Sequence, residues 1–333
     1  MRILLSRTDR VGDLILSTPA IASLRRSFPE AHITLVCSRY NAVVVERNRD
    51  IDALEIVPAG TEPPAFGRAF RGKADVAIAL APRTADIALV GATRARRRIG
   101  YTYVSRWSAR LGARRHLTDV LISEADPRLA DRRDPYPVRH EVLQVLGLAE
   151  RAGARRLVYD LTLPVTEADR ERVSAIPSGG VVVHIGQRWM QEGSTLASLV
   201  ALLGELRVLG RPIVVTYGDD AASVIPAIEA GAVADHVAGQ LPFAAWAALF
   251  EKSACVVTVD TGATHVASAM RRPTVVLFEH RYFRLNSQEW SPWGVPYALV
   301  RKPPNEEPSA LAAERAEIVE GVRRLIEFPL ACG

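Results

Sequence analysis

The stretch ILLSRTDRVGDLILSTPA, residues 3–20, begins with a short apolar run typical of a buried strand and ends in the pattern of a helix. Between them lies Gly12, which permits a tight turn and close approach of a ligand to the backbone. Asp13 follows in the expected first turn of the helix, where a carboxylate is favoured. The stretch therefore predicts the strand, turn and helix with which a parallel α/β sheet begins.

The same alternation of short strands and amphipathic segments runs along the whole chain of 333 residues. The expected strands lie at 3–6, 33–37, 54–57, 76–80 and 98–100 in the first half, and at 181–185, 213–216, 236–238, 255–259 and 274–278 in the second half. The apolar runs are continuous, as expected for strands covered on both faces. We therefore predict two α/β domains, joined by the charged stretch 151–177 and followed by a helix over 310–327.

The composition is that of an ordinary globular protein, with 48% hydrophobic and 24% charged residues. No apolar run approaches the roughly 20 residues needed to span a bilayer, and residues 1–6 carry no signal-peptide pattern. We therefore expect a cytoplasmic protein. The three cysteines, Cys37, Cys255 and Cys332, are widely spaced, which favours free thiols over a disulfide or a metal site.

The net charge of +5 is unevenly placed, because the segment from Arg94 to Arg115 holds eight arginines and no acidic residue. Such a segment could attract phosphate groups, an anionic membrane surface or nucleic acid. A solvated helix and loop rich in arginine fits the pattern equally well. We do not expect a nucleic-acid partner, because only Tyr101, Tyr103 and Trp107 are interleaved as stacking aromatics.

Asp13 has two interpretations. Ligands bind beyond the carboxyl ends of the strands in open parallel sheets, and Asp13 lies at that end of the first expected strand. There its carboxylate could accept the proton of an attacking hydroxyl. A carboxylate that caps the helix or matches its dipole fits the same spacing.

A second strand, turn and helix lies at VVTVDTGATHVA, residues 256–267. Backbone N–H groups at Thr261 and Gly262 would point out of the start of the helix, where a pyrophosphate can bind. Capping by Asp260 or Thr261, with His265 as a buried side chain, explains the same residues.

Two further strand ends carry polar residues. Gly186 and Arg188 follow the strand at 181–185, and an arginine there could neutralise the charge of a departing diphosphate. Stacking of this arginine on Trp189 is the alternative. Asp219 follows the strand at 213–216 and could hold a ribose hydroxyl or cap a helix.

Several motifs that would indicate other kinds of site are incomplete or absent. Residues 67–73 have the spacing of a phosphate-binding P-loop, but Ala74 replaces the required Ser or Thr, and the segment precedes a strand. No G-x-G-x-x-G follows a strand, which disfavours a dinucleotide dehydrogenase. Asp50 and Asp52 have no third ligand nearby, and no histidines form a metal-spaced pair. We therefore expect a mechanism without a metal.

Together these segments resemble glycosyltransferase family 9, the ADP-heptose:lipopolysaccharide heptosyltransferases. The resemblance is carried, in the order of the family, by Gly12-Asp13 with Ser17-Thr18-Pro19-Ala20, by Arg98-Ile99-Gly100-Tyr101, by Asp260-Thr261-Gly262 with His265, Ala267, Ala269 and Pro273, and by Val276-Leu277-Phe278. The matches span residues 3–278.

The resemblance implies a GT-B fold, in which two Rossmann-like domains with parallel sheets face each other across a cleft. Residues 1–160 would bind the acceptor, residues 161–308 would bind the nucleotide-sugar, and a helix in 309–333 would pack back across the molecule. The family inverts the anomeric configuration without a metal, and it takes the ADP-sugar as donor substrate with no further cofactor.

The resemblance also implies residue roles. Asp13 would be the general base, and Arg188 lies near a position where the family often has lysine. Substrate contacts are expected for Gly12, Thr18, Gly186, Asp219, Gln240, Leu241, Asp260, Thr261, Gly262 and His265, with Gln240 and Leu241 on the loop beside the adenine and Asp260, Thr261 and Gly262 on the loop that holds the donor sugar and diphosphate.

The expected reaction is transfer of a sugar, heptose from ADP-heptose, to a hydroxyl of a lipopolysaccharide core or a related glycan, in the cytoplasm and at the inner membrane surface. Two departures bear on the donor. Arg188 keeps the charge of lysine without its compact geometry. Glu279-His280-Arg281 replaces the turn that usually follows Phe278 in the family. A UDP-sugar transferase or epimerase, or a non-catalytic nucleotide-sugar-binding protein, is the alternative, and the acceptor and oligomeric state stay open.

Overall fold

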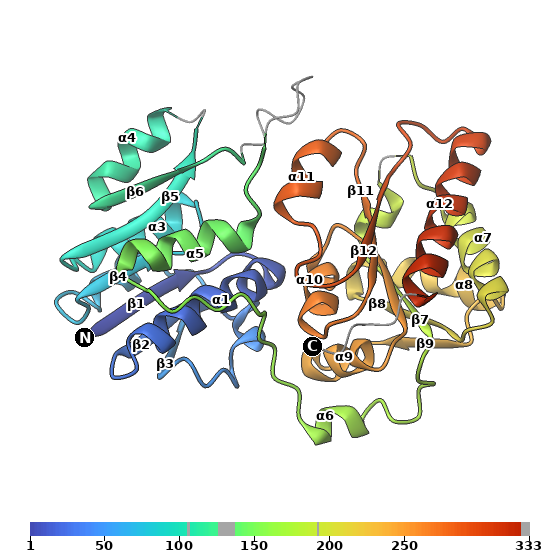
Figure 1. Cartoon of the computed structure of the whole chain (residues 1–333), viewed down its shortest axis with the longest axis horizontal. Coiled ribbons are helices and arrows are strands. Elements are labelled where there is room, and N and C mark those ends of the chain that lie inside the picture. Colours follow the sequence, from blue (N-terminus) through green and yellow to red (C-terminus); the bar gives the residue numbers. More distant parts are fainter. Residues whose placement is uncertain (105–106, 126–136, 192, 328–333) are drawn as a thin grey trace. The chain divides into compact units, whose positions relative to one another are not determined.

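The computed structural model describes residues 1–104, 107–125, 137–191 and 193–327. The chain divides into two compact units, Met1–Leu163 and Pro164–Gly333, each built on a six-stranded sheet (Figure 1). Every strand pair within both sheets is parallel. Two parallel sheets covered by helices form the GT-B fold, as predicted.

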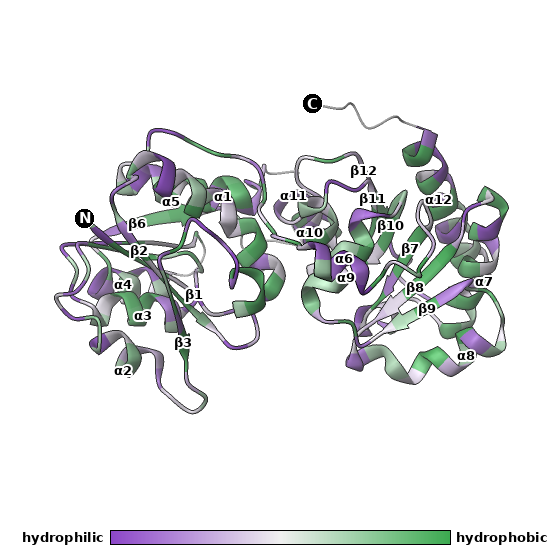
Figure 2. Ribbon diagram, turned by 90° about the horizontal axis from the view of Figure 1, so that it is seen from below, coloured by the Kyte–Doolittle hydropathy of each residue, from purple (hydrophilic) through white to green (hydrophobic). Residues whose placement is uncertain are grey.

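The first sheet has the strand order β3-β2-β1-β4-β5-β6. Helices α1 and α5 pack side by side on one face, and α2, α3 and α4 cover the other face (Figure 2). The elements are β1 (Arg2–Arg7), α1 (Val11–Ser27), β2 (His32–Ser38), η1 (Ala42–Val44), β3 (Ala53–Val57), α2 (Pro63–Arg68), β4 (Val76–Ala79), α3 (Thr84–Ala92), β5 (Arg97–Tyr103), α4 (Trp107–His116), β6 (Asp119–Ser123) and α5 (Glu141–Ala152).

The second sheet has the order β12-β11-β10-β7-β8-β9. Its elements are α6 (Glu167–Glu171), β7 (Val181–Ile185), η3 (Gln187–Met190), α7 (Leu196–Leu206), η4 (Arg207–Leu209), β8 (Ile213–Tyr217), η5 (Asp219–Val224), α8 (Ile225–Ala230), β9 (His236–Gly239), α9 (Phe243–Glu251), β10 (Cys255–Val259), α10 (Gly262–Ala269), β11 (Thr274–Phe278), α11 (Phe283–Glu289), β12 (Tyr297–Arg301) and α12 (Pro308–Glu327).

The last predicted helix is confirmed as α12. It packs against α7 and the strands β10, β11 and β12, and its Ile318, Val322 and Leu325 join the core of the second unit. These contacts lie within its own unit, so packing back across the molecule stays a prediction. Residues 328–333, which include Cys332, lie outside the described residues.

All ten predicted strands are present, and the two further strands, β6 and β12, lie at the edges of their sheets. The short apolar runs 120–122 and 297–300 lie in these strands but were not assigned as strands from the sequence, although the other two edge strands, β3 and β9, were predicted. The strand β6 is mostly half-buried, and β12 is exposed at both ends. Cys37 and Cys255 are buried free thiols, as predicted. Among the described helices, none is both long and apolar enough to cross a membrane.

Three hydroxyls of α1 hold the extended segment that leaves the first unit. The backbone N–H of Thr162 donates to Thr18 Oγ1 at 2.9 Å, that of Val158 donates to Ser23 Oγ at 2.8 Å, and that of Arg155 donates to Ser27 Oγ at 3.0 Å. The segment has no strand partner, so these side chains supply the hydrogen bonds that a half-buried backbone requires. The same hydroxyls fix α1, whose first turn carries Asp13.

Ser23→Ala is expected to lower the free energy of unfolding by about 1–2 kcal/mol, because the N–H of Val158 loses its acceptor at a partly buried position. Urea unfolding followed by circular dichroism measures the change. Ser174→Ala is the matched control, since this exposed hydroxyl bonds only to the nearby carbonyl of Glu171. Equal unfolding free energies for the Ser23 variant and the parent would contradict the role of the hydroxyl.

Candidate functional site

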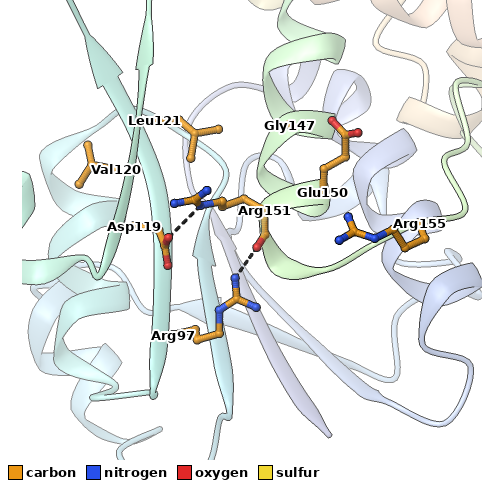
Figure 3. A pocket seen from close by; sticks show the side chains of 8 residues that line it. All are labelled: Arg97, Asp119, Val120, Leu121, Gly147, Glu150, Arg151 and Arg155. Atoms are coloured by element: carbon orange, nitrogen blue, oxygen red, sulfur yellow. Dashed lines mark hydrogen bonds and ion pairs between the residues drawn. The ribbon is translucent and has the colours of Figure 1, made fainter.

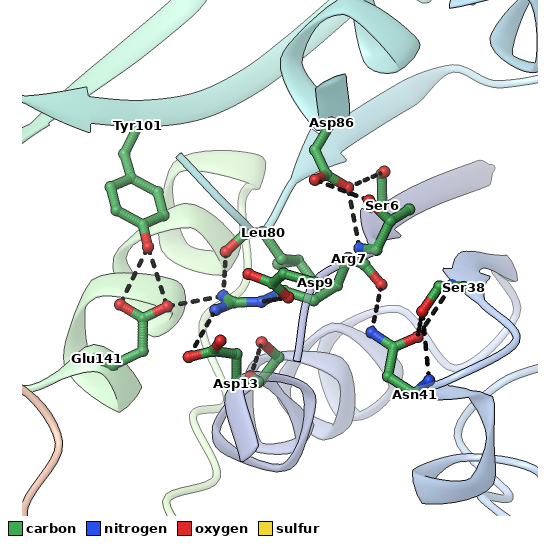
Figure 4. Close-up of polar contacts among 12 residues, drawn as sticks. Ser6, Arg7, Asp9, Asp13, Ser38, Asn41, Leu80, Asp86, Tyr101 and Glu141 are labelled. Carbon is green, nitrogen blue, oxygen red and sulfur yellow. Dashed lines mark hydrogen bonds and ion pairs between the residues drawn. The ribbon is translucent and has the colours of Figure 1, made fainter. Parts of the chain in front are cut away.

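The guanidinium of Arg7 is the centre of a polar cluster at the carboxyl end of β1 (Figure 4). Only 2% of this side chain is exposed, and it faces three carboxylates. Its Nε lies 2.9 Å from Asp9 Oδ1, its NH2 lies 3.3 Å from Asp13 Oδ1, and its NH1 lies 2.7 Å from Glu141 Oε1. NH1 also donates to the carbonyl of Leu80, which follows β4. The cluster therefore joins the ends of β1 and β4 to the start of α5.

Glu141 is the first residue of α5 and is almost fully buried. Besides Arg7, it accepts from the hydroxyl of Tyr101, whose oxygen lies 2.9 Å and 3.0 Å from the two carboxylate oxygens. Tyr101 belongs to β5 and is 3% exposed. Both oxygens of Glu141 are thus held, and α5 is fixed to the sheet beside Asp13.

The surroundings of Asp13 make its carboxylate unusually basic. Burial raises its pKa to about 7, Arg7 opposes the rise, and the negative charges of Asp9 and Glu141 add to it. Burial likewise raises the pKa of Glu141. A carboxylate that titrates near neutral pH can both take and release a proton there, as a general base must.

The structure distinguishes Asp13 from a helix cap. Arg10 occupies the N-cap position of α1, and no side chain makes the capping hydrogen bond. The carboxylate of Asp13 faces Arg7 and is 18% exposed. Gly12 is buried next to it, and Thr18 is fully buried with its hydroxyl donating to the carbonyl of Ile15.

A second buried carboxylate fixes the turn between β1 and α1. Asp86, in the first turn of α3, accepts from Ser6 Oγ at 2.6 Å and from the backbone N–H and the hydroxyl of Thr8, both at 3.1 Å. On the other side of the turn, Asn41 Nδ2 donates to the carbonyl of Arg7 at 3.0 Å. The backbone that presents Arg7 and Asp13 is therefore held from two sides.

In the second unit, the structure brings Arg188 and Asp260 together at the ends of the neighbouring strands β7 and β10. Arg188 NH1 donates to Asp260 Oδ2 at 2.8 Å and to its carbonyl at 2.9 Å. Asn286 Nδ2 donates to the same carboxylate at 3.0 Å, and Glu279 Oε1 lies 3.9 Å from Arg188 Nε. Trp189 is buried and donates its indole N–H to a carbonyl, so Arg188 is directed to carboxylates and not to a ring.

The loop after β10 lies beside this pair. Thr261 occupies the N-cap position of α10 in an extended conformation, and its side chain makes no capping hydrogen bond. Gly262 begins the helix, and His265 is buried within it. Gly186 lies close by, because a Cβ built on it would stand 3.7 Å from Thr261 Cγ2. These predicted residues are therefore neighbours.

The other predicted residues lie farther along the sheet. Asp219 is exposed at the start of η5, and its neighbour Asp220 accepts from the backbone N–H of Gln187 at 2.8 Å. Gln240 and Leu241 follow the edge strand β9, where Gln240 has a φ of 54°. The carboxylate that bonds to the backbone next to Arg188 is thus that of Asp220 and not that of the predicted Asp219.

Sequence reasoning missed Lys302, which follows β12 and is 1% exposed. Its Nζ donates to the carbonyl of Gln191 at 2.7 Å and to the carbonyl of Arg188. A lysine buried on backbone carbonyls holds the η3 segment that presents Arg188. Its position at the start of a polar, proline-rich stretch gave no signal of burial.

A cavity of about 650 Å³ lies at the other end of the first sheet, where strands β5 and β6 begin (Figure 3). Arg97 and Asp119, the first residues of β5 and β6, line it together with Arg151 at the end of α5. Arg151 Nε pairs with Asp119 at 2.8 Å, and Arg97 donates to the carbonyl of Ala152 at 3.2 Å. Arg97 thus satisfies carbonyls at the end of α5, where cations are favoured, and Arg151 is paired with a carboxylate, so we do not assign a substrate to this cavity. In the described part of the chain, no three His, Cys, Asp or Glu side chains gather to hold a metal ion.

Comparison with known proteins finds similarity to one family of glycosyltransferases. The model of the family described as "Glycosyltransferase family 9 (heptosyltransferase)" matches residues 201–317. Lipopolysaccharide heptosyltransferase 3 of Escherichia coli is 23% identical over 305 residues, which are 85% of this chain and 83% of that protein.

Two solved structures share the fold. A glycosyl transferase family 9 protein from Veillonella parvula superposes with a TM-score of 0.77 at 19% identity, covering 98% of this chain and 97% of its own. The E. coli ADP-heptose lps heptosyltransferase II gives a TM-score of 0.73 at 19% identity, with 98% of both chains covered. The family model, the E. coli relative and this fold together indicate that the chain is a glycosyltransferase similar to those of family 9.

Proposed function

We propose that the protein transfers heptose from ADP-heptose to a hydroxyl of a lipopolysaccharide core or a related glycan, in the cytoplasm and without a metal. The observation that carries the proposal is the carboxylate of Asp13, held by Arg7 at the end of the central strand β1 and titrating near neutral pH. The names of the relatives support the donor and the acceptor, since they are lipopolysaccharide heptosyltransferases and one is named for ADP-heptose.

Asp13 acts as the general base in this proposal. Its carboxylate takes the proton of the acceptor hydroxyl as the hydroxyl oxygen attacks the anomeric carbon of the donor. The bond from that carbon to the diphosphate breaks in the same displacement, so the configuration inverts and ADP leaves. The positive charge of Arg7 lowers the pKa of Asp13 and so favours the ionised carboxylate that accepts the proton. The negative charge of Glu141 raises this pKa and so keeps the carboxylate basic.

Arg188 and the start of α10 hold the departing diphosphate. The backbone N–H groups that open the helix at Gly262 favour an anion, and a guanidinium gives charge-assisted hydrogen bonds to phosphate oxygens. Arg188 is 29% exposed and pairs with Asp260, so the diphosphate would share the guanidinium with that carboxylate. Substrate contacts for Gly12, Thr18, Gly186, Asp219, Gln240, Leu241, Thr261 and His265 stay predictions.

A UDP-sugar transferase or epimerase is the second candidate, because the carboxylate of Glu279 stands 3.9 Å from Arg188 on a loop that departs from the family pattern. A nucleotide-sugar screen by thermal shift separates the two. A ligand that binds the folded state raises the melting temperature according to its concentration and affinity. Stabilisation by ADP-heptose and ADP supports the proposal, and stabilisation by UDP alone would replace it with the second candidate.

Asp13→Asn is expected to lower kcat for transfer by about 10²–10⁴-fold, because the acceptor hydroxyl loses its general base. The affinity for ADP, measured by calorimetry, should stay unchanged. Asp50→Asn provides a control for the loss of one carboxylate from the same unit. Full turnover by the Asp13 variant would refute the assignment of the base, and binding of the donor by a parent protein that never turns over would indicate the non-catalytic alternative.

The rate should depend on the protonation of Asp13. Because the base must be ionised, kcat falls as the pH drops below the Asp13 pKa of about 7. Glu141→Gln removes a negative charge that raises this pKa, so the acid limb of the pH–rate profile should move to lower pH. Tyr101→Phe leaves the charge in place and serves as the control. A limb that stays fixed in the Glu141 variant would show that Glu141 does not act on the base.

Arg188→Ala is expected to weaken ADP binding by about 10–100-fold, since a hydrogen bond to a charged group contributes roughly 1.5–3 kcal/mol. Glu279→Gln should strengthen ADP binding, because it removes a negative charge near the diphosphate. Calorimetric titration of both variants measures the dissociation constants. Unchanged affinity in the Arg188 variant would remove this residue from the donor site.

A further inference from the structure

Helix α4 exposes its large apolar side chains, whereas a surface helix usually packs such side chains against the core. Its two large apolar side chains point outward, with 70% of Trp107 and 53% of Leu111 exposed. The inner side carries Ala113, which is the buried residue of the helix, and the half-buried His116. Trp107 and Leu111 are one helical turn apart, so they form a continuous apolar ridge.

The packing of α4 explains why the ridge lies outside. The helix packs on α3, β5 and β6 at the rim of the first unit (Figure 1). A Cβ built on Gly91 of α3 would stand only 2.5 Å from His116 Nδ1, so the two helices lie very close. That spacing leaves no room for any side chain at position 91 opposite His116. Exposed apolar patches on a folded protein mark interaction surfaces.

The charge around the ridge has one sign. Helix α4 contains Arg110, Arg114 and Arg115 and no acidic residue. At 100° per residue, Arg110 and Arg114 flank the ridge on one side and Arg115 flanks it on the other. Arg94 and Arg96 are exposed near the end of the helix, where Arg98 Nε donates to the carbonyl of His116 at 2.6 Å.

We propose that the outer face of α4 docks on an anionic lipid bilayer, with Trp107 and Leu111 in the interface and the arginines on head-group phosphates. Tryptophan is favoured at the boundary of a bilayer, and a basic amphipathic helix lies in that plane with its apolar side chains inserted. Each arginine near an anionic surface contributes about fivefold to binding. Nucleic acid would use the arginines and Trp107 but gains nothing from Leu111. This inference rests on α4 and the arginines beside it, and it goes beyond the transfer reaction.

The test is co-sedimentation of the full chain with vesicles of phosphatidylcholine, with and without phosphatidylglycerol. The parent protein should bind the anionic vesicles. Trp107→Ser with Leu111→Ser should lower the partition coefficient by at least about tenfold, and Arg114→Ala with Arg115→Ala by roughly 25-fold, as two factors of about five.

Matched controls come from the second unit. Val208→Ser changes an apolar side chain that is 71% exposed, and Arg172→Ala with Arg324→Ala changes two exposed arginines, so both should bind as the parent does. Equal melting temperatures verify folding, which the outward side chains should not affect. Unchanged binding of the Trp107 and Leu111 variant, or binding of single-stranded DNA in place of anionic vesicles, would overturn the proposal. Either result leaves the assignment of Asp13 untouched.

Discussion

The first unit depends on the burial of one guanidinium. An arginine with 2% exposure is stable only if its charge is paired and its N–H groups are bonded. Asp9, Asp13, Glu141 and the carbonyl of Leu80 meet these needs from four places in the chain. Because Arg7 ends the central strand β1, satisfying it fixes the loops at that edge of the sheet. The position of the proposed base follows from this requirement.

The second unit also pairs an arginine with a carboxylate at the end of a strand, but this arginine is less buried. Arg188 also follows the end of a strand and also pairs with a carboxylate, that of Asp260, but the side chain of Arg188 is 29% exposed and that of Asp260 is 11% exposed. The backbone around it is held by Lys302, which is 1% exposed and bonds to carbonyls of the η3 segment. The fixed charge is thus Lys302 and the accessible one is Arg188. The guanidinium of Arg188 is partly exposed on a rigid backbone, which suits it to bind a ligand. The guanidinium of Arg7 is buried, which suits it to position Asp13.

The sequence predicted what is local and missed what depends on distant contacts. The strand, turn and helix around Asp13 and around Asp260 follow from periodicity and turn residues within about twenty positions. One partner of Arg7, Glu141, is 134 residues away, and no local pattern relates the two residues. Tyr101 was noticed as part of a motif, yet its bond to Glu141 depends on how α5 packs on the sheet. The edge strands β6 and β12 were missed as well, although each contains a short apolar run.

Burial, together with the charges of the Arg7 cluster, explains why the base titrates where it does. With Asp9, Asp13 and Glu141 all ionised, three negative charges face one positive charge. Repulsion and burial then favour a proton on Asp13, while Arg7 opposes its uptake. With Arg7 as its one charged neighbour, Asp13 would have a low pKa and would be a weak base. With the two carboxylates and no Arg7, its pKa would be so high that it would stay protonated. Accepting a proton from a hydroxyl neutralises the buried carboxylate and lowers the net negative charge of the cluster, so the proton transfer relieves both the desolvation and the repulsion that raise the pKa of Asp13.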